Sequence, residues 1–191
     1  MFESVLQMSA VPRFAIYEDI LQLPEGVAGE ILLGQLHTQP RPTSRHARVG
    51  IGLGHQLFGA FDFGSGGPGG WVILLEPELH LDGHVLIPDL GGWRRERLPV
   101  IPNGPVDVVP DWVCEILSPS TANKDRRLKL PLYGTLGVAN AWLVDPVAKT
   151  IEVLRFTDGH WVLLGTHGDD DQMRAEPFDA VAIDLAPLWA W

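Results

Sequence analysis

The chain has 191 residues, 46% of them hydrophobic and 20% charged, which fits one domain over residues 1–191 with a sizeable core. No apolar run of about 18 residues or more occurs, and the N-terminus Met1-Phe2-Glu3-Ser4 lacks the positively charged start of a secretion signal. We therefore expect a cytoplasmic protein without a membrane span. The net charge of -10 argues against broad contact with a nucleic-acid backbone, although acidic runs can lie far from a locally basic groove.

Hydrophobic periodicity in the first third of the chain predicts two helices and a strand between them. A short helix is expected over 17–23, closed by Pro24, followed by a strand over 29–36 that turns at Gly34. Thr43 or Ser44 can cap a longer helix that runs to about residue 61.

The middle of the chain reads as loops and short strands. The Gly-rich run over 64–70 predicts a surface loop and not a nucleotide site, because no Lys-Ser or Lys-Thr follows it. Strand segments are expected over 71–76, 78–81 and 84–88, and a tight hairpin turn at Asp82-Gly83 joins the last two. Beyond residue 89 we expect the chain to bend at Gly91-Gly92.

The last third predicts two buried strands with a helix between them. The near-continuous apolar run over 112–117 is typical of a strand covered on both faces, and an apolar strand over 139–144 follows a helix over 121–136 that Pro131 kinks or breaks. A hairpin is expected over 150–164. The apolar C-terminal segment then packs onto the core or onto another subunit, and we favour a homodimer contact through Leu188, Trp189 and Trp191.

Two acidic residues stand out because they lie at or inside apolar runs. Asp89 follows Ile87-Pro88, and Glu115 lies in the predicted central strand, where an unpaired ionised carboxylate costs several kcal/mol, roughly. Two carboxylates on neighbouring strands suit Mg²⁺, or Mn²⁺, which prefers oxygen ligands. The alternatives are that Asp89 is a turn residue and that Glu115 pairs with Arg126 or Arg127.

Four further residues complete the expected site. The backbone carbonyl of Ile116 is the expected third metal ligand, and Glu30 is a third carboxylate in an apolar strand context. Lys129, on the helix after the Glu115 strand, is the candidate cation for positioning an attacking water, with Lys124 as the runner-up. The lone Cys114 cannot form an internal disulfide, and we expect it to pack as a small hydrophobic residue.

Two groups of basic residues are candidates for DNA contact. Arg45 and His46 begin the long helix, and Arg94 and Arg95 follow Trp93, where guanidinium groups and an indole suit phosphates and bases. The alternative for the second group is a solvated loop with Trp93 tucked onto the core.

The sequence resembles the Uma-type restriction endonucleases, a branch of the PD-(D/E)XK nuclease superfamily, over nearly its whole length. The matching segments are Tyr17-Glu18-Asp19, Gly29 to Gly34, Ser44-Arg45-His46, Pro88-Asp89-Leu90, Pro110 to Thr121, Asp125, Lys129, Leu132-Tyr133, Gly137-Val138 and Trp142 to Pro146. The resemblance implies an α/β fold with a mixed sheet flanked by helices, a restriction-endonuclease-like core with additional β-hairpins. It also implies metal-ligand roles for Asp89 and Glu115 and a supporting role for Glu30. Leu117 stands where the superfamily carries its lysine, which points to Lys129 on the following helix.

These features predict a Mg²⁺-dependent endonuclease that hydrolyses phosphodiester bonds in DNA. A catalytically inactive nuclease-fold module that binds a partner is the main alternative, supported by the acidic composition and the apolar tail. A hydrolase of another phosphoester is a third. The recognition sequence and any methyltransferase partner are not encoded in a readable pattern.

Overall fold

The protein was analysed as a computed structural model, which describes residues 13–39 and 41–190. Residues 1–4, on which the expected absence of a secretion signal was based, lie outside the described residues, and so does Trp191. A six-stranded mixed sheet of order β10-β9-β8-β7-β6-β3 forms the centre, with only β7 and β8 parallel. Its strands are β3 (Trp71–Leu75), β6 (Leu90–Arg94), β7 (Trp112–Ile116), β8 (Asn140–Asp145), β9 (Thr150–Thr157) and β10 (His160–Gly168).

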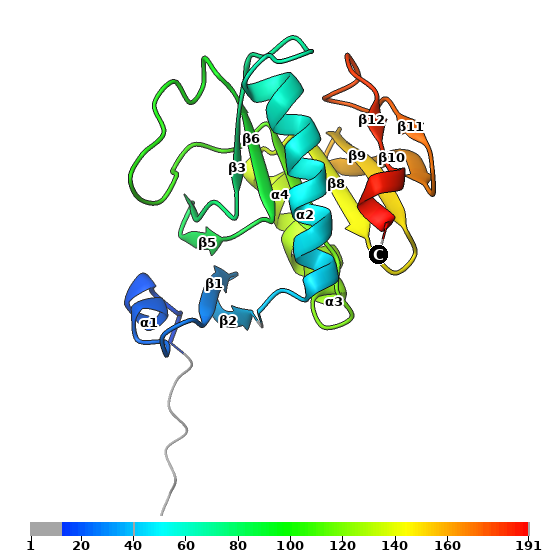
Figure 1. Cartoon of the computed structure of the whole chain (residues 1–191). Helices are drawn as coiled ribbons and strands as arrows, with labels where there is room; N and C mark the ends of the chain where they lie inside the picture. The colour runs from blue at the N-terminus through cyan, green and yellow to red at the C-terminus, as the bar shows by residue number, and fades with distance from the viewer. Residues whose placement is uncertain (1–12, 40, 191) are drawn as a thin grey trace, which may run out of the picture.

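Helices cover both faces of this sheet, which confirms the predicted mixed sheet flanked by helices (Figure 1). Side chains of β7 alternate between the two faces of the sheet. Trp112, Cys114 and Ile116 pack in one apolar cluster with α2 (Ser44–Leu57), while Val113 packs in the other with Tyr133. The α2 helix is capped by the Thr43 side chain, as expected, and continues as a π-helix, η1 (Phe58–Asp62). Cys114 is fully buried, as predicted for a small apolar residue.

The second helical layer connects the two parallel strands β7 and β8. It consists of α3 (Ala122–Lys124), η2 (Asp125–Lys129) and α4 (Leu130–Leu136), which together span the helix predicted over 121–136. Pro131 lies in the first turn of α4, where its missing N–H is tolerated, and the wider π-helical turn of η2 comes just before it. The proline therefore coincides with a local widening and not with a break.

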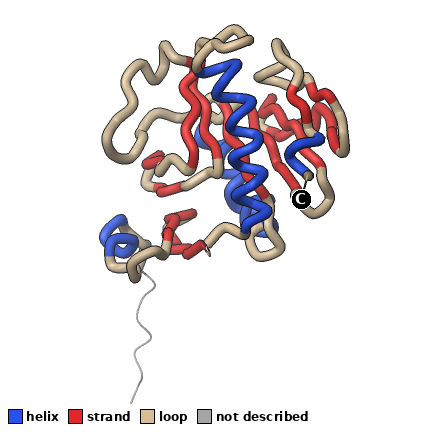
Figure 2. Tube along the Cα trace, in the orientation of Figure 1, coloured by secondary structure: helices blue, strands red, loops and turns tan. Residues whose placement is uncertain are grey.

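A smaller antiparallel sheet of order β2-β1-β5-β4 lies beside one end of the main sheet, next to α1 (Tyr17–Leu21) (Figure 2). Its strands β1 (Ala28–Leu32) and β2 (Gln35–Gln39) form the hairpin predicted to turn at Gly34. The strands β4 (Leu79–Leu81) and β5 (His84–Leu86) form the second hairpin, around Asp82-Gly83.

The bend expected at Gly91-Gly92 is wrong, because both residues lie within β6. A Cβ atom at Gly91 would lie 2.8 Å from the Trp93 ring, and one at Gly92 would lie 3.0 Å from the Trp112 ring. The glycines therefore make room for tryptophan side chains on a central strand. Trp93 is completely buried, so the tucked-in alternative for this residue is the one observed.

The apolar C-terminal segment packs on the core of its own chain. After β11 (Gln172–Met173) and β12 (Ile183–Asp184), the short 3₁₀-helix η3 (Ala186–Trp189) buries Leu188 completely and leaves Trp189 5% exposed. These two side chains are thus not available for the expected subunit contact. The homodimer stays a prediction, and Leu188 and Trp189 no longer support it. None of the described helices is long and apolar enough to cross a membrane.

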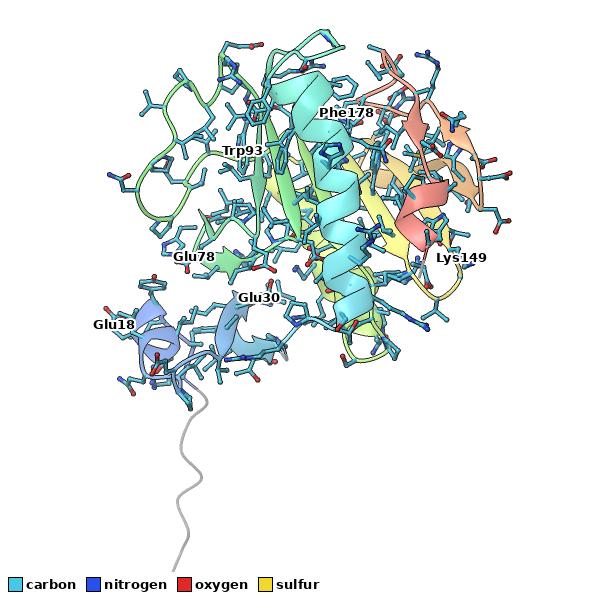
Figure 3. The ribbon with its side chains drawn as sticks, in the orientation of Figure 1. Glu18, Glu30, Glu78, Trp93, Lys149 and Phe178 are labelled. Atoms are coloured by element: carbon cyan, nitrogen blue, oxygen red, sulfur yellow. The ribbon has the colours of Figure 1, made fainter. Side chains whose placement is uncertain are left out.

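Phe178 lies at the centre of the larger apolar cluster, and we predict that its truncation is costly (Figure 3). Its ring centroid lies 4.7 Å from that of Trp71, 4.9 Å from Trp112 and 4.8 Å from Phe61. Phe178→Ala should lower the free energy of unfolding by about 3–5 kcal/mol, because it removes the buried ring and leaves a cavity. Urea denaturation measures the change. The matched control is Phe63→Ala at a 77% exposed position, and equal losses in the two variants would contradict the prediction.

Candidate active site

The pairing of β6 with β7 brings Asp89 beside Glu115. Leu90 lies opposite Cys114 in this antiparallel pair, so the preceding Asp89 reaches the position next to Glu115. The backbone N–H of Ile116 donates to Asp89 Oδ2 at 2.6 Å, and the backbone N–H of Glu76 donates to the Asp89 carbonyl at 2.9 Å. The Asp89 carboxylate is therefore held over the end of β7, where the two acids were expected to converge.

Both carboxylates line one pocket of about 250 Å³ at this end of the main sheet. The small sheet contributes to one side of it, the N-terminal end of α2 to another, and the turn between β7 and α3 to a third. The lining residues that carry polar side chains are Arg41, Thr43, His46, Glu76, Asp89, Glu115, Ser118, Ser120, Thr121 and Asp125.

His46 comes from the first turn of α2 and contacts Asp89 directly. Its Nε2 lies 2.7 Å from Asp89 Oδ1. Burial by itself lowers the pKa of His46, but the hydrogen bond with Asp89 and the negative charges of Asp89, Glu76 and Asp125 outweigh it, so the pKa is raised. His46 and the Ile116 N–H thus hold both oxygens of the Asp89 side chain.

Glu115 is held from the helix behind the main sheet. Tyr133 donates its hydroxyl to Glu115 Oε1 at 2.6 Å, and Lys129 Nζ lies 2.8 Å from the same oxygen. Burial raises the pKa of Glu115 well above its usual value, and the charges of Asp125, Asp89 and Glu30 act in the same direction against Lys129. The expected alternative partner Arg126 pairs with Glu152 instead, at 2.7 Å.

Lys129 connects this site to Glu30 on the small sheet. Its ammonium group lies 2.9 Å from Glu30 Oε1, 2.8 Å from Glu115 Oε1 and 2.9 Å from the carbonyl oxygen of Ile87. Burial by itself lowers the pKa of Lys129, but the negative charges of Glu115, Glu30 and Asp125 outweigh this effect, so the pKa is raised. The ammonium group is therefore surrounded by three oxygens, with the Ile87 carbonyl as a hydrogen-bond acceptor and the two carboxylates as ion-pair partners.

Lys124 contacts Glu30 and not Glu115 in this arrangement. Its Nζ lies 2.6 Å from Glu30 Oε2, while Glu30 Oε1 also accepts from the backbone N–H of Ile87 at 2.9 Å. Burial raises the pKa of Glu30, but Lys129 and Lys124 reverse this and lower it. Of the two candidate lysines, Lys129 is therefore the one in contact with the acid on β7.

Comparisons with known proteins identify the family and the fold. The Uma2 family, described as putative restriction endonucleases, matches residues 17–186. The chain belongs to the Uma2 family. A solved structure described as a putative nuclease belonging to DUF820 from Anabaena variabilis ATCC 29413 aligns with a TM-score of 0.70 and 23% identity, covering 90% of this chain and 96% of the other. This likeness confirms the restriction-endonuclease-like fold, and no curated protein matches the chain.

Within this Uma2 chain, sequence reasoning gave no site role to Glu76, Asp125 or Tyr133. Asp125, Lys129 and Tyr133 are four residues apart on one helix, so the helical repeat places them on one face, and this spacing was a usable signal. Glu76 carried no comparable signal. It adopts a left-handed backbone with φ of 46°, which is rare for a residue with a side chain and is set by its place after β3.

The residues predicted to contact DNA fall into two places. Arg45 and His46 lie in the first turn of α2, at the pocket end of the helix. Arg94 and Arg95 lie at the other end of β6 from Asp89, about 16 Å away for five extended residues. There Arg94 stacks 4.1 Å above the Trp71 ring and Arg95 pairs with Asp62 at 2.6 Å. Contact of these residues with DNA stays a prediction.

The donor set at the pocket fits a hard divalent cation. No three His, Cys, Asp or Glu side chains converge as a ready-made metal cluster within residues 13–39 and 41–190. Asp89 and Glu115 nevertheless supply oxygen donors beside the backbone of Ile116, and Mg²⁺ characteristically uses one or two carboxylates and retains waters. The crowded carboxylates that raise the pKa of Glu115 also favour a cation there.

We predict that Lys129→Met is strongly destabilising and that the loss depends on pH. Removing the ammonium group leaves Glu115 buried without a positively charged partner and Glu30 with Lys124 alone, which costs about 3–5 kcal/mol near neutral pH. The pKa of Glu115 in the folded state then rises further, because Lys129 is the group that lowers it, so the folded protein binds more protons than the unfolded one. The deficit should therefore grow as pH rises from 5 to 8, which urea denaturation at each pH measures.

Lys149→Met is the matched control, because Lys149 is exposed at a turn. This variant should lose little stability at either pH. A Lys129→Met deficit that is small, or that stays constant between pH 5 and pH 8, would contradict the compensating role of the buried ammonium group.

Proposed function

We propose that this protein is a metal-dependent endonuclease that hydrolyses phosphodiester bonds in DNA. The observation that carries the proposal is the meeting of Asp89 and Glu115 at one pocket, with Lys129 buried directly behind Glu115. Membership of the Uma2 family supports nuclease chemistry, and the metal and the DNA substrate are inferred from the pocket.

Asp89, Glu115 and the backbone carbonyl of Ile116 would hold Mg²⁺ or Mn²⁺. The bound cation supplies Lewis-acid stabilisation of charge on a phosphoryl oxygen and lowers the pKa of coordinated water. A phosphodiester in the same pocket would lie near Arg41 and the hydroxyl groups of the turn after β7.

The chain's own side chains hold the two acids in place. His46 and the Ile116 N–H fix the Asp89 carboxylate, and Tyr133 and Lys129 both contact Oε1 of Glu115. Because Lys129 is buried against Glu30, Glu115 and the Ile87 carbonyl, we assign it to positioning Glu115 and balancing charge, and not to the positioning of water that was expected from the sequence. Glu30 supports the site through the two lysines, without lining the pocket.

The non-catalytic interaction module loses one of its two supports. It relied on an acidic composition and on an apolar tail, and Leu188 and Trp189 of that tail are buried in the chain's own core. The nuclease proposal accounts better for four acidic side chains facing one pocket.

We predict that Asp89→Asn and Glu115→Gln abolish cleavage. Purified protein should cut DNA with Mg²⁺ or Mn²⁺, and each substitution removes an anionic oxygen needed to hold the cation. Cleavage of a supercoiled plasmid, followed on agarose gels, measures the effect. Glu96→Gln, at an exposed position, is the matched control and should cut normally. Equal cutting by all three variants would reject the assignment.

We predict a separate effect of His46 on metal affinity. His46→Ala leaves Asp89 without one of its two contacts, and the loss of such a supporting partner weakens metal binding about 10- to 100-fold. Titration calorimetry with Mn²⁺ measures the affinity, and His46→Gln should restore part of it by donating an amide N–H. His55→Ala, exposed on the same helix, is the control.

The same titration tests the competing interaction module. Heat of Mn²⁺ binding in the native chain that disappears in Asp89→Asn supports the nuclease. No heat in the native chain would favour the non-catalytic module.

A further inference from the structure

A second, apolar pocket adjoins the carboxylate pocket. It has a volume of about 130 Å³ and shares Pro42, His46, Glu76, Asp89 and Ile116 with its neighbour. The residues that line only this second pocket are apolar: Ala47, Gly50, Ile51 and Leu75. A group bound here would therefore be next to Asp89 but would meet mainly carbon.

Two large apolar side chains face this pocket while remaining open to solvent. Ile51 on α2 is 64% exposed, and Leu75 at the end of β3 is 51% exposed. A single exposed apolar residue is normal on a protein surface, but two that converge on one cavity beside a polar site are typical of a ligand-binding surface. Gly50 contributes no side chain between them, and the buried Ile116 side chain lies beneath it, 3.3 Å from where a Cβ of Gly50 would be.

Continuity with the carboxylate pocket limits what can bind. If a phosphodiester lies at Asp89 and Glu115, the group in the apolar pocket must be attached to that phosphate. In DNA the only large, flat and largely apolar face next to a phosphate is that of a base. Such a face is exposed only where the nucleotide is unpaired, because a paired base must first be unstacked at a cost of a few kcal/mol, roughly.

The charge distribution also favours contact with one nucleotide at the pocket over contact with many phosphates along a duplex. The chain carries a net charge of -10, and Arg95, Arg97, Arg126 and Arg155 are each paired with an acid of the same chain. Affinity for a duplex comes largely from many phosphate contacts by basic residues. This surface is poorly suited to that mode, so a base bound beside the reacting phosphate would have to supply part of the affinity.

We propose that the preferred substrate is DNA with an unpaired nucleotide at the cleavage position, whose base rests against Ile51 and Leu75 while the adjoining phosphate lies at Asp89 and Glu115. This rests on the proposed nuclease function. It specifies single-stranded DNA, a flap or an overhang as the substrate class, in preference to continuous duplex.

The test compares oligonucleotides of one sequence as single strands and as duplexes, with Mn²⁺ as the metal. The native protein should show kcat/KM at least about tenfold higher on the single strand. The double variant Ile51→Gln/Leu75→Gln should raise KM on the single strand about tenfold with little change in kcat, because base contacts of this kind are worth about that factor. Leu163→Gln, 56% exposed on β10, is the matched control.

A single strand with one abasic position distinguishes the base from the sugar as the occupant. The native protein should cut next to the abasic position as poorly as the double variant cuts normal DNA, and the double variant should not be weakened further. Additive losses would show that the pocket does not bind the base and would overturn the inference.

The outcomes separate this inference from the function on which it rests. Cleavage of duplex as well as or better than single strands, with the double variant unchanged, would overturn the inference alone. No cleavage of either substrate by the native protein would overturn the nuclease proposal and the inference with it.

Discussion

The buried ammonium group of Lys129 is the interaction on which the rest of the site depends. It lies between Glu30 of the small sheet and Glu115 of the main sheet and also donates a hydrogen bond to the carbonyl oxygen of Ile87. A buried charge is tolerated only when it is paired and hydrogen-bonded, so these three acceptors must stay where they are. One side chain therefore ties two sheets and a helix into a single arrangement around the pocket.

The same arrangement concentrates more negative charge than Lys129 can balance. Asp89, Glu115 and Asp125 line the pocket, and their mutual repulsion adds to burial in raising the pKa of Glu115. Like charges held close together cost stability in a protein without a cation, and functional sites are where such costs are usually found. The hydrogen bonds from Tyr133, His46 and the Ile116 N–H reduce that cost without removing the charge that a cation requires.

The sequence was most informative where an acidic residue interrupts an apolar run. Asp89 and Glu115 could be found because an acid in an apolar strand needs compensation, and Lys129 could be found from its helix. The features that could not be predicted depend on packing between residues far apart in the sequence. For example, β6 continues through Gly91-Gly92 because the Trp93 and Trp112 rings fill the space that side chains would take there. For the same reason the apolar C-terminal segment was compatible with the chain's own core and with another subunit, and the sequence did not decide between them.

The roles of individual residues were harder to predict than their positions. His46 was expected to contact DNA, and the structure adds a contact with Asp89 that depends on the approach of α2 to the end of β6. Lys129 was expected to act on water, yet its donors are used by Glu30, Glu115 and a backbone carbonyl. The set of oxygens around a buried ammonium group is a property of the folded site, and the spacing of residues in the sequence does not reveal it.

The acidic surface and a polyanionic substrate are compatible if affinity is local. The net charge of -10 sums over the whole surface, while a phosphate in the pocket responds to the groups within a Debye length, about 10 Å or less. Within that range lie Arg41, His46 and the position between Asp89 and Glu115 that suits a divalent cation. Under the proposed function, local affinity favours the binding of one nucleotide over many contacts along duplex DNA, and the neighbouring apolar surface of Ile51 and Leu75 is proposed as part of that site.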